Sequence, residues 1–497
     1  MRMPAVSPRL LLPAVLAAGL LLRLALAYLV FPGQGYAGDL RLFAGWAQAL
    51  AERGPAGFYG SDPSANYPPL YLYVLWALGA LAGPLASLLH VTAGQALPLL
   101  LKLPAMLADV GVAALAARVA GRWLGGAAGV AAAALYLIVP VTWYDSALWG
   151  QVDAVAVLVM MAALVLLIEG HSEPAAVLAV LGVLTKPQAL VCLAVVAPVL
   201  LRRHLLAGRD PLRLLTSAIA AAAAAVVVLV PFDVERFAPA PLAGVPAVGD
   251  VAGLIGLVRS TADQFSVLTA NAYNLWALVG PRPLVDGFSA AASSWTPDSL
   301  AVLGGEPAAV VGAALLAAVA LLVAGGLLVR DGTLAIVLGF TVMAFAFYAL
   351  PTRVHERYLF PVFASGAILA AGAVARAVAF AAVGLLNTLN LHAVLAAPAA
   401  FGGIGGRFGA GPPPGLRGGG PGPGRQGFGG GGPGFGGFGG PGAVSVTDVH
   451  LPLAELARSP LVATAAVLGQ TAALVALIGL WLVLLARAPT GGDRWPA

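Results

Sequence analysis

Charged residues are scarce in this chain: only 9% of its 497 residues are Asp, Glu, Lys or Arg, whereas 60% are hydrophobic. A soluble globular domain carries roughly 25% charged residues. So few charges mean that lipid, rather than water, is the solvent for most of the chain. The composition therefore predicts a membrane protein that crosses the bilayer many times.

Cysteine and blocks of like charge are also lacking. A single cysteine, Cys192, excludes a disulfide framework and a cysteine-based metal site. The formal net charge of +5 comes from few, scattered groups, so a nucleic-acid partner is not expected. No cluster of acids and histidines has the spacing of a metal site, and neither a metal nor another cofactor is expected.

Long apolar runs are what the chain has in abundance. A spanning helix needs about 20 mostly apolar residues, and ten such runs together with one broken pair predict an all-α protein with about twelve transmembrane helices. The runs lie near 10–30, 97–117, 124–141, 151–168, 212–231, 306–329, 333–350, 359–375, 378–398 and 460–486, and the broken pair is 175–185 and 187–201.

The apolar run 69–89 decides the topology. It is broken by Gly79, Gly83 and Pro84, and it is predicted to lie on the outer membrane surface without crossing. With that choice, twelve of the 26 Lys and Arg residues fall in short loops on the cytoplasmic side, where basic residues accumulate. The choice also brings the most polar segments, including 35–54, 65–71, 141–154 and 352–358, to one extracytoplasmic face, which suggests a single site there.

Composition divides the chain further. Residues 1–400 form the membrane module, with a first external loop at 31–96 and a long external segment at 232–305. Residues 402–443 hold 23 of the 63 glycines and no acid, and such a tract is expected to form a flexible external loop. Residues 444–497 are predicted to hold an external amphipathic segment and the last transmembrane helix.

Asp39 is the acid that most needs an explanation. It follows the first apolar run, beside Gly35 and Gly38, and precedes an amphipathic helical pattern that contains Trp46. One interpretation is an N-cap, because Asp before a helix accepts the free amides of the first turn. The other is a catalytic carboxylate, and the pattern alone leaves both open.

The order of these motifs resembles the GT-C class of membrane glycosyltransferases. A first span, an acid in the first external loop, a Trp-containing helix and Asn66-Tyr-Pro-Pro69 are similar to the dolichyl-phosphate glucosyltransferases, the protein O-mannosyltransferases and the lipid A aminoarabinose transferase. Val354-His-Glu-Arg357 looks like the VHEK-type motif of the glucosyltransferase branch. The resemblance covers about residues 10–400, and Asp39 and the YPP and HER pieces are its specific parts.

The resemblance implies a GT-C fold and an inverting glycosyltransferase of the cell membrane. Such an enzyme moves a hexose or pentose from a polyprenyl-phosphate sugar to an acceptor glycan, lipid or protein on the extracytoplasmic face. It implies Asp39 as the general base that takes the proton of the acceptor hydroxyl. The segment after Pro-Pro is commonly a juxtamembrane helix in that class.

A cationic group is needed for the phosphate that leaves. Arg353, His355 and Arg357 lie between two apolar runs and are predicted to grip a lipid phosphate at headgroup depth, with Glu356 beside them. The alternative is an interfacial cluster whose long side chains reach water, in which Glu356 pairs with a neighbouring arginine.

Charges inside apolar runs complete the predicted site. Asp153, one turn inside the fourth run, resembles the second catalytic-site acid of two GT-C branches, although Asp145 is a rival and either acid could merely cap a helix. Lys186 and Asp109 both reach the middle of the membrane, at ~1.5 Å per residue. One interpretation is that the two form an ion pair with each other. The other is that Lys186 binds the donor phosphate.

Two further residues, Gln151 and Tyr67, are predicted to bind substrate, although an aromatic side chain at this depth also fits a membrane-interface belt. A transporter or flippase is the alternative function. Transporters tend to have duplicated halves and midplane polar residues on broken helices. Only Lys186 in the broken pair has that character, and no internal repeat is evident.

Overall fold

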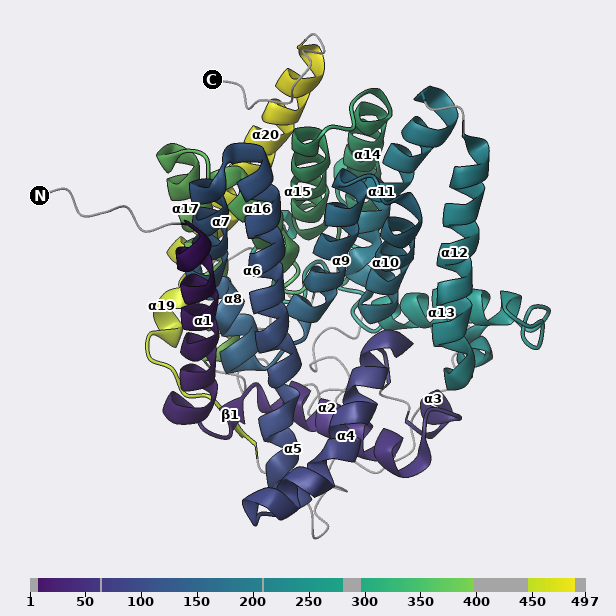
Figure 1. Cartoon of the computed structure of the whole chain (residues 1–497), viewed down its shortest axis with the longest axis vertical. Coiled ribbons are helices and arrows are strands. Elements are labelled where there is room, and N and C mark those ends of the chain that lie inside the picture. Colours follow the sequence, from purple (N-terminus) through teal and green to yellow (C-terminus); the bar gives the residue numbers. More distant parts are fainter. Residues whose placement is uncertain (1–7, 63–64, 208–209, 280–295, 397–445, 488–497) are drawn as a thin grey trace, which may run out of the picture.

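The computed structural model describes residues 8–62, 65–207, 210–279, 296–396 and 446–487. In these residues almost every element is a helix (Figure 1). The N-terminal half holds α1 (Pro8–Ala25), α2 (Ala37–Arg53), α3 (Phe58–Ser61), α4 (Pro69–Leu89), α5 (Ala93–Leu101), α6 (Leu103–Leu124), α7 (Gly126–Ile138), α8 (Pro140–Trp143), α9 (Asp153–Ile168), α10 (Ser172–Thr185), α11 (Leu190–Leu201) and α12 (Pro211–Leu229).

The C-terminal half continues in the same way. It holds α13 (Val248–Asp263), α14 (Ala308–Val329), α15 (Thr333–Ala349), α16 (Phe360–Ala370), α17 (Val374–Leu395), α19 (Ala454–Arg458) and α20 (Pro460–Ala486). Short 3₁₀ or π turns, labelled η, join or extend several of these helices; η2 (Tyr144–Trp149) and η7 (Leu275–Leu278) matter for the site.

Eight helices in the described residues are long and apolar enough to cross a membrane, or nine if the pair α7 and α8–η2, bent by 53°, counts as one span. The predicted number of about twelve is not confirmed. Four helices that the prediction counted as spans, α9, α10, α15 and α16, are apolar but shorter than a spanning helix. Helix α4, which was predicted not to cross, is long enough to do so. A polytopic all-α membrane architecture is nonetheless plain.

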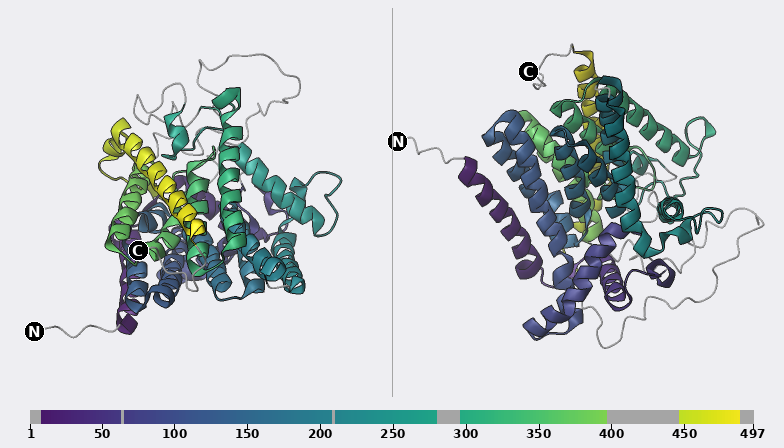
Figure 2. Two further views of the ribbon diagram at one scale, coloured as in Figure 1. Left: turned by 90° about the horizontal axis from the view of Figure 1, so that it is seen from above. Right: turned by 45° about the vertical axis from the view of Figure 1, so that its right-hand side comes forward.

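Helices of this bundle differ in what they face. In α15 almost every residue is buried, from Leu334 to Ala349, which is typical of a helix surrounded by protein. In α14 the apolar side chains Val310, Leu315 and Leu321 are exposed, which fits a face that meets lipid. Figure 2 shows α1 at the edge of the bundle in both views.

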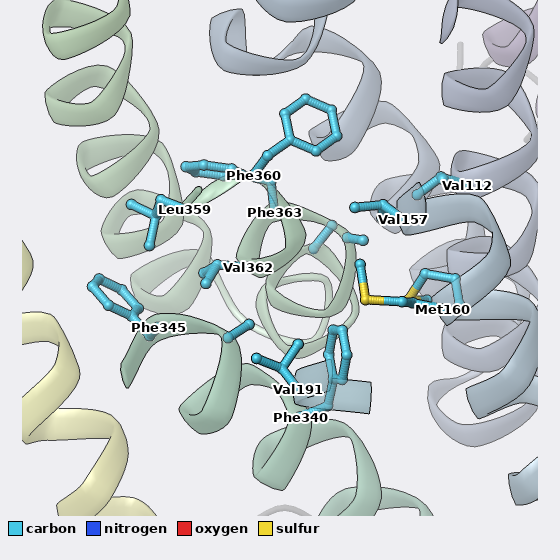
Figure 3. Packing of buried hydrophobic residues seen from close by; sticks show 14 of the residues in the cluster. Val112, Val157, Met160, Val191, Phe340, Phe345, Leu359, Phe360, Val362 and Phe363 are labelled. Carbon is cyan, nitrogen blue, oxygen red and sulfur yellow. The ribbon is translucent and has the colours of Figure 1, made fainter. Parts of the chain in front are cut away.

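The largest core cluster fills the bundle. Val112 of α6, Val157 and Met160 of α9, and Phe340 of α15 lie together in it, and Figure 3 shows their side chains beside those of Phe360 and Phe363. Apolar side chains from distant parts of the chain therefore hold the bundle together. A second cluster lies around α2 and α4 and contains Phe43, Trp46 and Leu75.

Helices α2, α4 and α5 gather at the lower end of Figure 1, and α13 runs roughly horizontally at the right, beside α12. Helices α2 and α4 approach closely at Gly79, where a Cβ atom would lie 2.1 Å from the Ala47 carbonyl oxygen. A glycine is thus required at that crossing. The start of α1 and the end of α20 lie toward the opposite end of the molecule (Figure 1).

Two very short strands join distant segments. Gln34–Gly35 (β1) pairs in parallel with Thr447–Asp448 (β2), with Gln34 opposite Thr447 and Gly35 opposite Asp448. The chain after residue 445 thereby returns to the first loop. The predicted flexible tract 402–443 lies outside the described residues.

Candidate active site

Asp39 lies in the first turn of α2 and is only 4% exposed. The N-cap residue of this helix is Tyr36, whose side chain makes no capping hydrogen bond. The interpretation of Asp39 as the N-cap is therefore wrong. Its Oδ2 instead accepts hydrogen bonds from Trp149 Nε1 at 2.8 Å and from Gln151 Nε2 at 2.5 Å. The carboxylate is thus aimed at η2 and its C-terminal loop.

A sharp turn after η2 presents Trp149 and Gln151 to Asp39. Gly150 has a φ of 86°, and the amides of Gly150 and Gln151 both donate to the Asp145 carbonyl at 3.0 Å. A Cβ atom on Gly150 would lie 2.7 Å from Leu40 Cδ2. Left-handed backbone in a crowded position requires glycine, and this explains why Gly stands between Trp149 and Gln151.

Aromatic rings close one side of this group. Tyr36 stacks on Trp149 with ring centroids 4.9 Å apart, and its amide donates to the Trp149 carbonyl at 3.0 Å. The Tyr67 hydroxyl donates to Gln151 Oε1 at 3.4 Å. Tyr67 and Gln151, both predicted to bind substrate, therefore lie beside Asp39.

Asp153 lies at the start of α9 and pairs with Lys186. Asp153 Oδ1 accepts hydrogen bonds from Lys186 Nζ at 2.7 Å and from Gln188 Nε2 at 2.5 Å. Lys186 follows α10 in an extended conformation, at the break that the sequence indicates. Its ammonium group lies 5.8 Å from the ring centres of Tyr67 and Tyr358, so the broken pair delivers a cation to the site.

The predicted ion pair between Lys186 and Asp109 is wrong. Asp109 Oδ2 accepts from Arg23 Nε at 2.6 Å and from Ser146 Oγ at 2.6 Å, and its Oδ1 accepts from Tyr136 at 2.8 Å. Asp109 and Arg23 are fully buried. Since Arg23 comes from α1, 86 residues earlier in the chain, spacing along the sequence could not reveal the pairing.

Arg357 brings the third part of the chain to the site. Its Nη1 donates to Glu356 Oε1 at 2.7 Å, its Nε lies 3.8 Å from Asp153 Oδ2, and its guanidinium lies 5.6 Å from the Trp149 ring centre. Burial acts to lower the pKa of Arg357, but the carboxylates of Glu356 and Asp39 outweigh it and raise this pKa. Arg357 therefore stays cationic.

His355 enters the site as a neutral group. Its ring lies between Phe265 and Tyr358, with centroids 4.6 Å and 5.3 Å away. Burial, followed by the positive charges of Arg357 and Lys186, lowers its pKa well below the ordinary 6.5. The imidazole can therefore accept or donate one hydrogen bond, but it adds no positive charge near neutral pH.

Arg353 lies apart from this group. Its Nε donates to Asp298 Oδ2 at 2.6 Å and its Nη1 to Asp263 Oδ1 at 2.8 Å. Its φ of 65° turns the backbone at the start of the loop, so the side chain faces the long external segment. Two acids that the sequence analysis did not single out thus take the place expected for a lipid phosphate.

Two residues of the site, Gln188 and Lys102, were not predicted from the sequence. Gln188 binds Asp153, and Lys102 Nζ donates to the carbonyls of Gln34 at 2.6 Å, Ala147 at 2.7 Å and Leu148 at 3.1 Å. Lys102 thereby ties the first loop to η2. A basic residue inside the apolar run 97–117 was the signal that could have found it.

No grouping of three His, Cys, Asp or Glu suited to a metal ion occurs in the described residues. The expectation that no cofactor is needed stays a prediction. A hollow of about 630 Å³ lies elsewhere, between α7 and α17, and its lining is apolar, for example Leu135, Ile138 and Phe380. It is separate from the polar group around Asp39.

No protein-family model and no curated protein sequence matches the chain. Solved structures do. AglB, an archaeal oligosaccharyltransferase from Archaeoglobus fulgidus in complex with an inhibitory peptide and a dolichol-phosphate, is 14% identical, with a TM-score of 0.42 over 76% of this chain and 51% of that one. An oligosaccharyltransferase of the same organism in the apo form is 15% identical, with a TM-score of 0.41 over 78% of this chain and 52% of that one.

ArnT from Cupriavidus metallidurans bound to undecaprenyl phosphate is 16% identical, with a TM-score of 0.39 over 80% of this chain and 66% of that one. AglB and ArnT are GT-C glycosyltransferases, the class that the motifs of this chain resemble. The chain spans about half the length of the oligosaccharyltransferases. All three TM-scores are below 0.5, so the function proposed next rests on the side chains of this chain.

Proposed function

We propose that the chain is a GT-C glycosyltransferase that transfers a monosaccharide from a polyprenyl-phosphate sugar to an acceptor hydroxyl. The observation that carries the proposal is the convergence on Trp149, whose indole N–H donates to Asp39 while its ring faces the Arg357 guanidinium at 5.6 Å. A buried carboxylate and a buried cation from segments more than 300 residues apart thus meet at one side chain.

Two cations are available for the donor phosphate. Lys186 Nζ is bound to Asp153, and Arg357 lies near the same carboxylate at 3.8 Å. A phosphate diester that becomes a monoester gains negative charge, and fixed cations stabilise that change. An arginine fork and a lysine ammonium together suit a phosphate without a metal ion.

Asp39 is placed to act as the general base. Trp149 and Gln151 orient its carboxylate through two hydrogen bonds to Oδ2. In the proposed step the acceptor O–H bond breaks and its proton passes to Asp39. A new bond forms from that oxygen to the anomeric carbon, while the bond to the phosphate oxygen breaks and its electron pair leaves with the polyprenyl phosphate. A single displacement inverts the anomeric configuration.

The site is proposed to face the extracytoplasmic side of the cell membrane. The acceptor is a glycan, a lipid or a protein that presents a hydroxyl group there. Asp39 and its partners lie near the end of the molecule where α2, α4 and α5 gather, away from the start of α1 and the end of α20 (Figure 1). Basic turns elsewhere in the chain support the opposite end as cytoplasmic.

The substitution Asp39→Asn tests the function. It keeps the shape of the side chain but removes the base, and transfer should fall by about 100-fold or more, since general bases contribute ~10²–10⁴. Binding of the polyprenyl-phosphate sugar should be unchanged. The measurement is transfer by the purified chain in lipid nanodiscs from a panel of undecaprenyl-phosphate sugars, with mass spectrometry of the products.

Glu52→Gln serves as the matched control, because Glu52 is exposed on the same helix. It should transfer at the rate of the unsubstituted chain. Translocation of a lipid-linked sugar across proteoliposomes that depends on Asp39, without any product of transfer, would instead support the flippase alternative.

A further inference from the structure

Buried acceptor atoms without hydrogen-bond partners gather beside the two cations. Both side-chain oxygens of Asp145 lack a partner among the described residues, as do Asp153 Oδ2 and Gln188 Oε1. Exposure of these three side chains is 0%, 0% and 3%. An acceptor that is buried without a donor is costly, and native interiors rarely hold several together. Such a group therefore points to donors supplied by a ligand.

The side chains of Gln188 and Asp153 are hydrogen-bonded to each other, and the backbone carbonyl of Asp145 holds the turn that leads to Asp153. Asp153 Oδ1 takes the donors of Lys186 and Gln188 at 2.7 Å and 2.5 Å, so Asp153 Oδ2 and the Gln188 carbonyl belong to one cluster. Asp145 interacts electrostatically with Asp153, Lys186 and Arg357. Its carbonyl holds the turn at Gln151, the partner of Asp39. The cluster thus adjoins both the proposed base and the proposed phosphate site.

The chemistry of the missing donors is restricted. A phosphate or a carboxylate presents only acceptors when ionised, so neither satisfies Asp153 Oδ2 or Gln188 Oε1. The Arg357 Nε group lies 3.8 Å from Asp153 Oδ2, which is too far for a hydrogen bond. A ligand group with several O–H donors in a small volume fits, and a sugar ring is such a group.

We propose that Asp145, Asp153 and Gln188 form a subsite for the hydroxyl groups of the transferred sugar, and that this sugar is neutral rather than a uronic acid. The proposal rests on the glycosyltransferase function, which places the donor phosphate on Lys186 and Arg357. The phosphate then lies on the cation side of Asp153 and the hydroxyl groups lie on its acceptor side. A uronate would add a carboxylate beside the carboxyl groups of Asp145 and Asp153, and acidic groups that close together disfavour one another's ionised form.

Binding of five lipids tests the subsite. The probes are undecaprenyl phosphate, its glucosyl, mannosyl and arabinosyl esters, and its glucuronosyl ester, each titrated against the full-length chain in nanodiscs. At least one neutral ester should bind about tenfold tighter than undecaprenyl phosphate, because new hydrogen bonds to buried, unpartnered acceptors form. The glucuronosyl ester should show no such increase.

Asp145→Ala should abolish the tighter binding of the neutral ester and leave the affinity for undecaprenyl phosphate unchanged. Gln188→Leu should reduce the gain in affinity for the neutral ester over undecaprenyl phosphate. This second variant provides the test if Asp145→Ala does not fold. Lys186→Met should weaken binding of every probe, which separates the phosphate site from the sugar subsite.

Three outcomes would overturn the subsite while the function stands: no neutral ester binds tighter than undecaprenyl phosphate, the glucuronosyl ester binds tightest, or both Asp145→Ala and Gln188→Leu keep the full increase. Failure of the unsubstituted chain to bind undecaprenyl phosphate at all would contradict the proposed function itself.

Discussion

His355 is the side chain of the site whose charge depends most clearly on its surroundings. The ring lies against Phe265 and Tyr358, and burial together with Arg357 and Lys186 lowers its pKa well below 6.5. In the unfolded chain the same histidine titrates near 6.5. The folded state therefore binds fewer protons than the unfolded state just below that pH, and this difference affects stability.

We predict that acidification from pH 7 to pH 5 destabilises the protein partly through His355. Because the unfolded state takes up the proton that the folded state refuses, the free energy of unfolding falls as pH falls, by at most about 1.4 kcal/mol per pH unit for one group. His355→Phe should show a smaller fall in Tm between these pH values, measured by thermal unfolding in detergent.

His171→Phe is the control, because His171 is exposed in the turn before α10. Its Tm should follow the unsubstituted chain across the same pH range. An identical pH dependence in His355→Phe and the unsubstituted chain would contradict the role of His355.

At this scale the sequence indicated which residues matter better than it indicated their partners. The carboxylate of Asp39 and the cation of Arg357 could be predicted from motifs, and the structure brings them to one indole. Arg353 could not be distinguished from Arg357, because the acids that hold it, Asp263 and Asp298, lie in a segment 55 or more residues away. Partners chosen by tertiary packing leave no local pattern.

At the scale of elements, the start of α2 depends on a residue from the far end of the chain. The backbone amide of Ala37 donates to Asp448 Oδ1 at 2.9 Å, and Arg41 donates to the Val446 carbonyl at 2.8 Å. The N-cap residue Tyr36 offers no side-chain acceptor to this helix. A carboxylate at a helix N-terminus also interacts favourably with the helix dipole. Asp448 thus supplies the acceptor that caps the N-terminus of α2, which is the role that the sequence had suggested for Asp39.

We predict that Asp448→Ala loosens the first turn of α2 and lowers transfer, since Asp39 lies two residues beyond Ala37. Loss of a capping acceptor costs about 0.5–2 kcal/mol. Asp448→Asn keeps an acceptor oxygen and should restore most of the activity. The measurements are hydrogen exchange of residues 37–41 and the rate of transfer in each variant.

Glu455→Ala is the control in the same segment, because its side chain is 94% exposed. It should change neither quantity. Equal transfer by Asp448→Ala and the unsubstituted chain, with faster exchange in the first turn, would show that the cap stabilises the helix without positioning Asp39.

Element boundaries were predictable where apolar runs are long and end at glycine or proline. The break at Lys186, before Pro187, was expected, and the structure has α10 end there. The turn at Gly150 was not expected, because its need for a left-handed backbone comes from the π-helical turn before it. A Cβ atom at Gly150 would also lie 2.7 Å from Leu40 Cδ2, and no local sequence pattern encodes this tertiary neighbour.

At the scale of the whole molecule, charged turns collect in ion pairs that join neighbouring helices. Arg118 and Arg122 both bond Glu169, with Arg118 Nε 2.6 Å from Glu169 Oε1. Arg202 and Arg203 bond Asp331 at 3.0 Å and 2.6 Å. These pairs join the C-terminal part of α6 to the turn after α9, and the segment after α11 to the turn after α14. They hold four of the twelve basic residues that the topology prediction assigned to the cytoplasmic side.

We predict that the turn at His171 and the end of α2 at Glu52 lie on opposite sides of the membrane. The test uses Cys192→Ala as background, because Cys192 is the one cysteine and is buried. A cysteine is then introduced by His171→Cys or by Glu52→Cys, both at exposed positions. An impermeant maleimide added to intact cells should label the Glu52→Cys protein and leave the His171→Cys protein unlabelled until the membrane is permeabilised.

The same labelling decides whether the site can meet an extracytoplasmic acceptor. Glu52 lies on the helix that carries Asp39, whereas His171 lies beside Glu169, where Arg118 and Arg122 pair. Labelling of both cysteines in intact cells would contradict the separation of sides. Labelling of His171→Cys alone would place the polar site on the cytoplasmic side. The acceptor would then have to be sought among cytoplasmic molecules, even if the chemistry at Asp39, Trp149 and Arg357 remained as proposed.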